Sequence, residues 1–324
     1  MLRVAFAGTF AASLEAPVRQ RLTVPCEIVV ADEAKIVARL ADIDVLVTLV
    51  LTPEMGRRAS RLKLVQVPGA GIDRIDHSAV PAGASLANVY GHETGIAEYA
   101  MGAMLALTRE FSRLDAALRQ GDWQSQWNVG TPPPPVWPEL AGKTVGILGY
   151  GRIGQCIARR ARAFDMNICA IRRDVRQSAE DDLVLLGGPE ILDEMLQRSD
   201  YLVISMPAAA ETIGCIGHRQ LGLMKRTAFL INVARAQIVE EAALYEALAQ
   251  HLIAGAALDV WYRYPGAPGP TGPASLPFHQ LPNVLMTPHV SGWTDGMLEA
   301  RAALIAENIR RVAEGKPLLN LMSR

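Results

Sequence analysis

The sequence predicts an α/β protein built from two doubly wound domains, each with a parallel sheet covered by helices on both faces. Strand-like and helix-like segments alternate along nearly the whole chain, which is typical of parallel sheets because a crossover must separate neighbouring strands. A glycine-rich turn, GYGRIG at 149–154, stands between a strand-like run and a helix-like run. The large segment before this turn must form a different domain, and 324 residues are enough for two.

Composition and charge exclude several classes of protein. Half of the residues are hydrophobic, a fifth are charged, and the net charge of −1 comes without a basic block, so we expect no nucleic-acid partner and no membrane partner. The four cysteines are scattered without metal-ligand spacing, which predicts reduced thiols, no metal site and a cytoplasmic protein. Residues 1–16 have some features of a signal peptide, but 3–8 is better interpreted as a first buried strand.

The first half of the chain is expected to hold five strands. A helix is expected at 33–43, and a long helix, apolar nearly all round in its first half, at 93–119. The segment 121–140 contains four consecutive prolines and cannot form regular structure, so we interpret it as a linker into the second domain rather than as a proline-rich ligand for another protein. The five strands are expected at 3–8, 26–32, 44–51, 62–71 and 85–90.

The second half predicts six strands with intervening helices, the number of a full doubly wound dinucleotide-binding fold. A last helix, 294–314, is expected to pack back onto the first domain. The predicted domains are therefore 1–100 plus 292–324, and 101–291. The strands are expected at 144–148, 167–173, 201–207, 228–234, 253–261 and 283–289, and the helices at 152–164, 189–197, 218–225 and 240–250.

The GYGRIG turn has the context of a dinucleotide-binding site. Gly149 permits a tight turn, Gly151 lets the backbone approach a pyrophosphate, and Gly154 lets the helix pack closely on the strand. The amides at the start of the helix, at Arg152 and Ile153, face the phosphates. The alternative is a purely structural turn. Pro207, after the third strand of this half, completes the predicted cofactor lining.

Three polar residues follow strands of the second half, where ligands of open α/β sheets bind. Arg235 suits a carboxylate, which a guanidinium grips with two parallel hydrogen bonds. His289 suits proton exchange with a carbonyl or hydroxyl oxygen, and Asp259 ends the strand between them. Taken singly, such an arginine is usually a surface charge and such a histidine a loop residue. Together, on a sheet that begins with GYGRIG, they predict an active site.

Several segments together resemble the D-isomer-specific 2-hydroxyacid dehydrogenase family, in particular its glyoxylate and hydroxypyruvate reductases. The matching segments occur in the family's order and span nearly the whole chain, at 67–76, 88–109, 149–154, 231–248, 255–261 and 281–294. The resemblance implies two Rossmann-like domains with a cleft between them, the first of them flavodoxin-like. It also implies a homodimer.

The resemblance also implies roles for individual residues. Arg235 would hold the substrate carboxylate or carbonyl, His289 would protonate the carbonyl oxygen, and Asp259 would hydrogen-bond the nicotinamide carboxamide. The backbone amides of Ala70 and Gly71 would help to hold the carboxylate. Trp293, just after the HVSG turn, is expected to wall the substrate pocket or to pack in the core.

The chain departs from the family pattern at the partner of the histidine. Most members have a glutamate immediately before the proline of this segment, and here that position is Tyr264. A neutral phenol can orient the imidazole but cannot stabilise its protonated form by charge, so we expect His289 to favour reduction at lower pH. Glu98 or Asp295 are the alternative sources of the missing charge.

A second departure concerns the cofactor. The acidic position that normally binds the ribose 2′-hydroxyl falls on Arg172, and Arg173 follows. Two guanidinium groups suit a 2′-phosphate, so we expect NADP(H) to be favoured, with NAD(H) as the alternative. In that alternative both arginines point to solvent and Asp174 contacts the ribose.

The predicted function is the NAD(P)H-dependent reduction of a small 2-keto acid, of the glyoxylate or hydroxypyruvate type, to the D-2-hydroxy acid. Two alternatives remain open within the same resemblance. One is a formate- or phosphite-type dehydrogenase, and the other is a non-catalytic dinucleotide-sensing interaction protein of the corepressor type.

Overall fold

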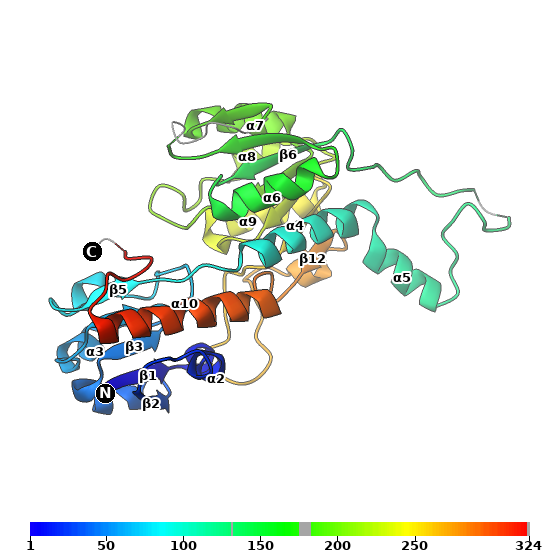
Figure 1. Ribbon diagram of the computed structural model, residues 1–324. Helices are drawn as coiled ribbons and strands as arrows, with labels where there is room; N and C mark the ends of the chain where they lie inside the picture. The colour runs from blue at the N-terminus through cyan, green and yellow to red at the C-terminus, as the bar shows by residue number, and fades with distance from the viewer. Residues whose placement is uncertain (131, 175–182, 323–324) are drawn as a thin grey trace. The chain divides into compact units, whose positions relative to one another are not determined.

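The computed structural model describes residues 1–130, 132–174 and 183–322 and contains two compact units (Figure 1). Unit 1 comprises Met1–His92 and Trp293–Arg324, and unit 2 comprises Glu93–Gly292. The predicted boundary at residue 100 therefore falls too late. It would cut helix α4 (Glu93–Thr108), which belongs as a whole to unit 2 because its apolar residues pack on the sheet of that unit.

Unit 1 is built on a parallel sheet with the strand order β2-β1-β3-β4-β5. This is the flavodoxin-like order of a doubly wound sheet. Four of the five strands lie within the segments that the sequence predicts, and β1 begins one residue before its predicted segment 3–8. The strands are β1 (Leu2–Ala7), β2 (Cys26–Ala31), β3 (Val45–Thr48), β4 (Leu64–Gln66) and β5 (Ser85–Ala87).

Helices cover both faces of the unit 1 sheet. Helices α1 (Thr9–Ser13), α2 (Glu15–Arg19) and α10 (Asp295–Glu314) share one core with it, so the last helix does return to the first unit as expected. The other face packs against α3 (Pro53–Arg58) and η1 (Lys35–Asp42). The segment expected as a helix at 33–43 is thus a 3₁₀ helix, which still buries Ile36 and Leu40. A short 3₁₀ helix, η2 (His77–Ala79), follows β4.

Unit 2 is built on a seven-stranded parallel sheet with the order β12-β11-β10-β9-β6-β7-β8. Counted from β6, this is the 3-2-1-4-5-6 order of a dinucleotide-binding fold with one further strand at the edge. The strand β8 is too short to be recognised in the sequence. The strands are β6 (Thr144–Leu148), β7 (Asn167–Ile171), β8 (Leu185–Gly187), β9 (Tyr201–Ile204), β10 (Phe229–Asn232), β11 (Gly255–Leu258) and β12 (Val284–Met286).

The two faces of the unit 2 sheet carry separate cores. On β9, Leu202 and Ile204 face one core while Tyr201 and Val203 face the other, as side chains alternate along a strand. Helices α4 and α6 (Arg152–Arg162) cover the second of these faces. The first is covered by α7 (Leu192–Arg198), α8 (His218–Leu223) and α9 (Glu241–Ala249), together with the 3₁₀ helices η4 (Pro189–Ile191), η5 (Ala236–Ile238) and η6 (Phe278–Gln280).

An extended arm, residues 109–130 and 132–139, projects from the rest of unit 2 after α4 (Figure 1). The long helix expected at 93–119 is two helices, because the chain turns at Glu110, whose φ of 51° is left-handed, before α5 (Phe111–Arg119). Helix α5 buries none of its residues, and Trp127 is 78% exposed. The segment 121–140 is not a linker between the units, because it lies within unit 2.

Candidate active site

The three glycines of the turn between β6 and α6 have different surroundings. Gly149 has a φ of 110°, and a Cβ atom there would lie 2.5 Å from the backbone nitrogen of Met206. A Cβ atom at Gly154 would lie 2.4 Å from the carbonyl oxygen of Gly149, so helix and strand touch at this point. At Gly151 a Cβ atom would meet nothing within 4 Å among the described residues, which leaves open space above the turn.

The open space lies at the start of α6, an eleven-residue helix. Gly151 is its N-cap and supplies no side-chain hydrogen bond to the helix. Arg152 is exposed, whereas Ile153 is partly buried against the core. The hydroxyl of Ser205, after β9, donates to the carbonyl oxygen of Gly149 over 2.9 Å and ties the turn to the neighbouring strand. The strand order reverses between β6 and β9, where ligands of this fold class bind.

Arg172 and Arg173 follow β7, the strand beside β6. Arg172 is half-buried and its backbone amide donates to the carbonyl oxygen of Gly187 over 3.0 Å. Arg173 is more exposed and pairs with Glu211 at 3.6 Å. Pro207, after β9, is exposed. Residues 175–182 lie outside the described part of the chain.

Arg235 is held by the turn that follows β10. The amide of Asn232 donates from Nδ2 to the carbonyl oxygen of Arg235 over 3.0 Å, and its Oδ1 accepts from the backbone of Ala234 over 3.1 Å. An asparagine that bonds its own backbone two and three residues on fixes such a turn. The guanidinium of Arg235 donates from Nη1 to the carbonyl oxygen of Ala234 over 2.8 Å. Arg235 is therefore half-buried and directed by the backbone after β10.

Asp259, after β11, is fully buried and serves the turn that carries His289. Its Oδ1 accepts from Thr287 Oγ1 at 2.7 Å and from the backbone of Val290 at 2.8 Å, while Oδ2 accepts from the backbone of Ser291 at 2.8 Å. Both carboxylate oxygens are thus engaged by the protein itself. The contact of Asp259 with a nicotinamide carboxamide stays a prediction.

His289 sits in a left-handed backbone conformation, with a φ of 57°. For a residue other than glycine this conformation costs about 1–3 kcal/mol and persists only where the surroundings enforce it. The backbone amide of His289 donates to the carbonyl oxygen of Thr287 over 3.1 Å, and the same oxygen accepts from the indole of Trp261 over 2.8 Å. Asp259 holds the two residues that follow.

Tyr264 and His289 are direct partners. The phenol oxygen of Tyr264 lies 2.7 Å from Nδ1 of His289, and it also accepts from the backbone amide of Trp261 over 3.3 Å. Tyr264 therefore occupies the place beside the histidine where the resemblance leads us to expect a glutamate. Glu98, the alternative source of charge, instead accepts from Arg160 over 3.0 Å. Asp295 belongs to unit 1.

The electrostatic environment disfavours a charged imidazole. Although His289 is an exposed residue, desolvation by the surrounding protein atoms lowers the pKa of its imidazole. Asp259 opposes this effect and Arg235 adds to it. Burial likewise raises the pKa of Tyr264, so its phenol is neutral. Because Arg235 and Asp259 both influence His289, the three residues that follow β10, β11 and β12 share one site, at the same edge of the sheet.

The predicted substrate-binding residues of unit 1 have their own surroundings. Ala70 lies in the loop after β4, and its carbonyl oxygen accepts from Nδ2 of Asn88 over 3.0 Å. Gly71 next to it is exposed. Trp293 is 49% exposed and packs on Phe10, with 5.6 Å between ring centroids. The part of these residues in substrate binding stays a prediction.

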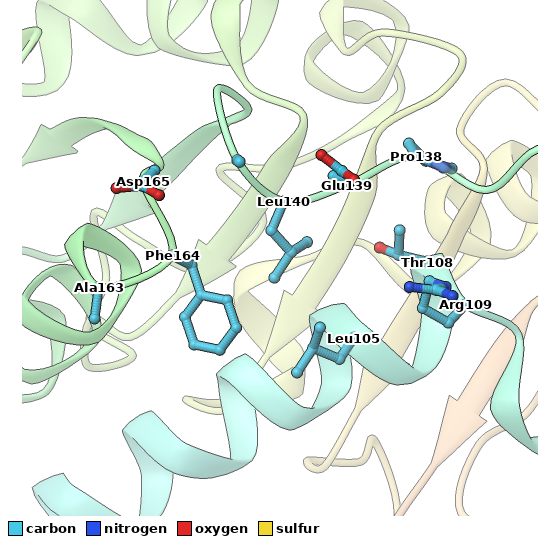
Figure 2. Close-up of a pocket in the computed structure, with 10 residues that line it drawn as sticks. Leu105, Thr108, Arg109, Pro138, Glu139, Leu140, Ala163, Phe164 and Asp165 are labelled. Atoms are coloured by element: carbon cyan, nitrogen blue, oxygen red, sulfur yellow. The ribbon is translucent and has the colours of Figure 1, made fainter.

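A cavity of about 320 Å³ lies elsewhere in unit 2 (Figure 2). It is bounded by the end of α4, by residues 138–141 and by residues 163–165, with Leu105, Leu140 and Phe164 as apolar lining. Residues 138–141 and 163–165 precede β6 and β7, so the cavity lies at the amino ends of these strands. The residues of the candidate active site follow strands, at the opposite edge of the sheet.

Three residues of the site were not predicted from the sequence. Asn232 holds the arginine turn, Thr287 bonds Asp259, and Tyr99 of α4 lies with its hydroxyl 2.6 Å from Thr287 Oγ1. An asparagine that ends a strand is a turn signal, so the role of Asn232 could have been predicted from the sequence. Tyr99 lies in an apolar helix far away in the sequence, where nothing marks it.

Two structural observations bear on other classes of function. Nowhere in residues 1–130, 132–174 and 183–322 do three histidine, cysteine or acidic side chains gather as metal ligands. The helices of the same residues are all too short or too polar to cross a bilayer.

Comparisons with known proteins identify the family of this chain. The NAD-binding-domain model of the D-isomer specific 2-hydroxyacid dehydrogenase family matches residues 101–291. The chain is 35% identical over 283 residues to a glyoxylate reductase of Thermococcus gammatolerans, with 86% of this chain and 82% of that enzyme covered. It is 33% identical over 298 residues to a D-3-phosphoglycerate dehydrogenase of Methanocaldococcus jannaschii, with 89% of this chain but 53% of that enzyme covered, so it spans about half of that relative.

A solved structure extends the likeness to the whole fold. The NADPH-dependent glyoxylate/hydroxypyruvate reductase of Sinorhizobium meliloti, solved with NADP and malonate, matches at a TM-score of 0.80 and 29% identity, over 99% of this chain and 97% of that one. The chain belongs to the D-isomer specific 2-hydroxyacid dehydrogenase family. It is an NAD(P)-dependent oxidoreductase of that family.

Proposed function

We propose that the protein reduces a small 2-keto acid, of the glyoxylate or hydroxypyruvate type, to the D-2-hydroxy acid with NADPH. The observation that carries the proposal is the grouping of Arg235, Asp259, Tyr264 and His289 at the carboxyl edge of the unit 2 sheet, with Tyr264 at 2.7 Å from His289. Turnover of reduced nicotinamide with a panel of 2-keto acids tests it.

The residues at the switch point fit a dinucleotide. Open space above Gly151, at the start of α6, suits a pyrophosphate, because the N-terminus of a helix attracts anions. Gly149 and Gly154 are required by the turn itself, and Pro207 lies on the neighbouring strand end. When bound, the nicotinamide supplies the hydride.

Arg235 and His289 carry the remaining chemistry in this proposal. The guanidinium of Arg235 binds the carboxylate of the keto acid and orients its carbonyl group. The protonated imidazole of His289 donates from Nε2 to the carbonyl oxygen, while its Nδ1–H is retained by the phenol oxygen of Tyr264. Arg235 disfavours the imidazolium until the negative charge of the substrate compensates it. Substrate binding and protonation of His289 thus favour each other.

The preference for NADPH rests on Arg172 and Arg173. Both follow β7, where an acidic residue would repel a 2′-phosphate and an arginine accommodates it. Arg172 is the stronger candidate, because Arg173 already has Glu211 as a partner. The reductase of Sinorhizobium meliloti, which is described as NADPH-dependent, supports this preference.

The choice of substrate rests on the relatives. Glyoxylate reductases are 34–35% identical and cover more than four fifths of this chain, as in Thermococcus gammatolerans and Thermococcus kodakarensis. The comparisons do not favour a formate-type dehydrogenase or a corepressor. A cytoplasmic location stays a prediction.

We also propose that the protein is a homodimer whose arms are covered by the second copy. The arm presents large apolar side chains to solvent: Trp123 is 57% exposed, Trp127 78%, Val129 94% and Val136 96%. Large apolar side chains exposed along one extended segment favour a protein–protein interface.

A further inference from the structure

A chain of hydrogen bonds connects helix α4 to the turn that carries His289. The hydroxyl of Tyr99 lies 2.6 Å from Oγ1 of Thr287, and the same Oγ1 lies 2.7 Å from Oδ1 of Asp259. All of these residues belong to unit 2. These hydrogen bonds therefore lie inside one compact unit and lead from a helix on one face of the sheet to its carboxyl edge.

The direction of these hydrogen bonds follows from the chemistry of the groups. A carboxylate can only accept, so the single hydroxyl hydrogen of Thr287 is donated to Asp259. The hydroxyl of Tyr99 must then donate to Thr287. Burial raises the pKa of Tyr99 to about 12, so the phenol keeps its proton at neutral pH.

At its other end the chain holds the backbone around His289. Asp259 accepts from the amides of Val290 and Ser291, the two residues that follow the histidine. His289 itself has the left-handed φ of 57°. Asp259 and Thr287 therefore enforce the backbone conformation of His289. Tyr99 stabilises both residues through its hydrogen bond to Thr287.

We propose that Tyr99 is a positioning residue, which acts through Thr287 and Asp259 to hold His289 in its left-handed conformation and to aim its imidazole at the substrate. The inference rests on the proposed role of His289 as the proton donor. Three charged or titratable groups act directly on this histidine: Arg235, Asp259 and Tyr264. A fourth, Tyr99, contacts its turn through Thr287.

The protein contains a second tyrosine–threonine pair that serves as a matched control for Tyr99 and Thr287. Tyr201 at the start of β9 has its hydroxyl 2.6 Å from Oγ1 of Thr108, the same pair of residue types at the same distance. Tyr201 is buried, and burial raises its pKa too. Because this pair lies at the amino edge of the sheet, Tyr201→Phe removes an equivalent hydrogen bond without touching the His289 turn.

The kinetic test compares Tyr99→Phe with Tyr201→Phe. We expect Tyr99→Phe to lower kcat about two- to tenfold, the equivalent of one hydrogen bond, with the Kd for NADPH unchanged. Tyr201→Phe should lower the melting temperature to a similar degree and keep the kcat of the parent. Thr287→Ser, which retains a hydroxyl, should preserve kcat, whereas Thr287→Val should reproduce the loss.

A second test does not depend on turnover. Hydrogen exchange of the Val290 and Ser291 amides reports directly on the turn, because both amides donate to Asp259. We expect faster exchange in Tyr99→Phe and parental exchange in Tyr201→Phe. The inference is wrong if the two variants show the same exchange at these amides. If the parent reduces no 2-keto acid, the proposed function fails, and the exchange result alone decides the role of Tyr99.

Discussion

The imidazole of His289 has a phenol rather than a carboxylate at its Nδ1. A carboxylate would only accept, and would therefore impose the Nδ1–H tautomer and raise the pKa of the histidine by its charge. The hydroxyl of Tyr264 can donate or accept, so it orients the ring in either protonation state but adds no charge. Desolvation then dominates and lowers the pKa of His289.

Tyr264→Glu should move the pH dependence of reduction upward. In the proposed mechanism, reduction uses protonated His289, so the rate falls as the pH rises through the pKa of this residue. A nearby carboxylate raises that pKa, and we expect the falling limb of kcat/KM to shift by about one pH unit or more to higher pH. Tyr264→Phe, which adds no charge, is the control and should keep the limb near its parental position. Superimposable profiles for the parent and Tyr264→Glu would refute this account of the histidine.

The site residues that follow strands were predictable at this scale. Of the residues that support them, Asn232 carries a turn signal in the sequence, but Tyr99 does not. Arg235, Asp259 and His289 could be grouped from the sequence because parallel strands end at a common edge. Tyr99 could not, because its partner Thr287 is 188 residues away and a tyrosine in an apolar helix is usually a packing residue. The pairing of Tyr264 with His289 was suggested by the resemblance and is seen in the structure.

At the scale of elements, the glycines of the turn between β6 and α6 fall into two kinds. Gly149 and Gly154 are required by the backbone conformation and packing of the turn, whereas Gly151 borders open space. Gly149 combines a positive φ with a backbone atom in the way of any Cβ, whereas a Cβ at Gly151 meets only open space. The same motif thus contains a structural glycine and a glycine that the fold alone does not require.

Substitution by alanine should therefore affect stability at Gly149 and cofactor binding at Gly151. Gly149→Ala should lower the free energy of unfolding by at least about 1–3 kcal/mol, because the residue is forced into a disfavoured φ and meets Met206. Gly151→Ala should leave the melting temperature within about one degree of the parent and weaken NADPH binding. Thermal unfolding and cofactor titration on both variants measure this. Unchanged NADPH affinity in Gly151→Ala would contradict the assignment of the open space to the cofactor.

Most strands could be predicted because their apolar runs are bounded by glycine or polar residues. The break between α4 and α5 could not, since Arg109 and Glu110 are both good helix formers and local preference predicts continuation. The three-residue strand β8 carries too short a pattern to be distinguished from a loop.

At the scale of the whole molecule, the chain forms two units whose boundaries do not follow the sequence order. Trp293–Arg324 returns to unit 1, where α10 shares a core with α1 and α2. The sequence indicated this return because the last helix follows the sixth predicted strand of the second half. The first boundary was misplaced because α4 and the preceding loop differ in packing rather than in composition.

The arm gives a prediction about assembly. If a second copy covers its apolar side chains, the protein should have twice the 35.0 kDa mass of one chain in light scattering after gel filtration. The double variant Trp123→Ser, Trp127→Ser should dissociate to monomers at low micromolar concentration. Trp293→Ser, which changes an exposed tryptophan outside the arm, serves as the control. A parent protein that is monomeric at all concentrations would contradict the proposed dimer.

The central claim is that the protein reduces a small 2-keto acid with hydride from NADPH. In it, Arg235 binds the carboxylate of the substrate and His289 donates the proton. Its most direct test is the loss of NADPH absorbance with glyoxylate, hydroxypyruvate and larger 2-keto acids, in parallel with NADH. We expect turnover of at least one small 2-keto acid, a higher kcat/KM with NADPH, the D configuration in any chiral product, and a loss of about 10²–10⁴-fold in His289→Gln. Tight binding of NADPH without its oxidation by any 2-keto acid would contradict the account and point to a dinucleotide sensor.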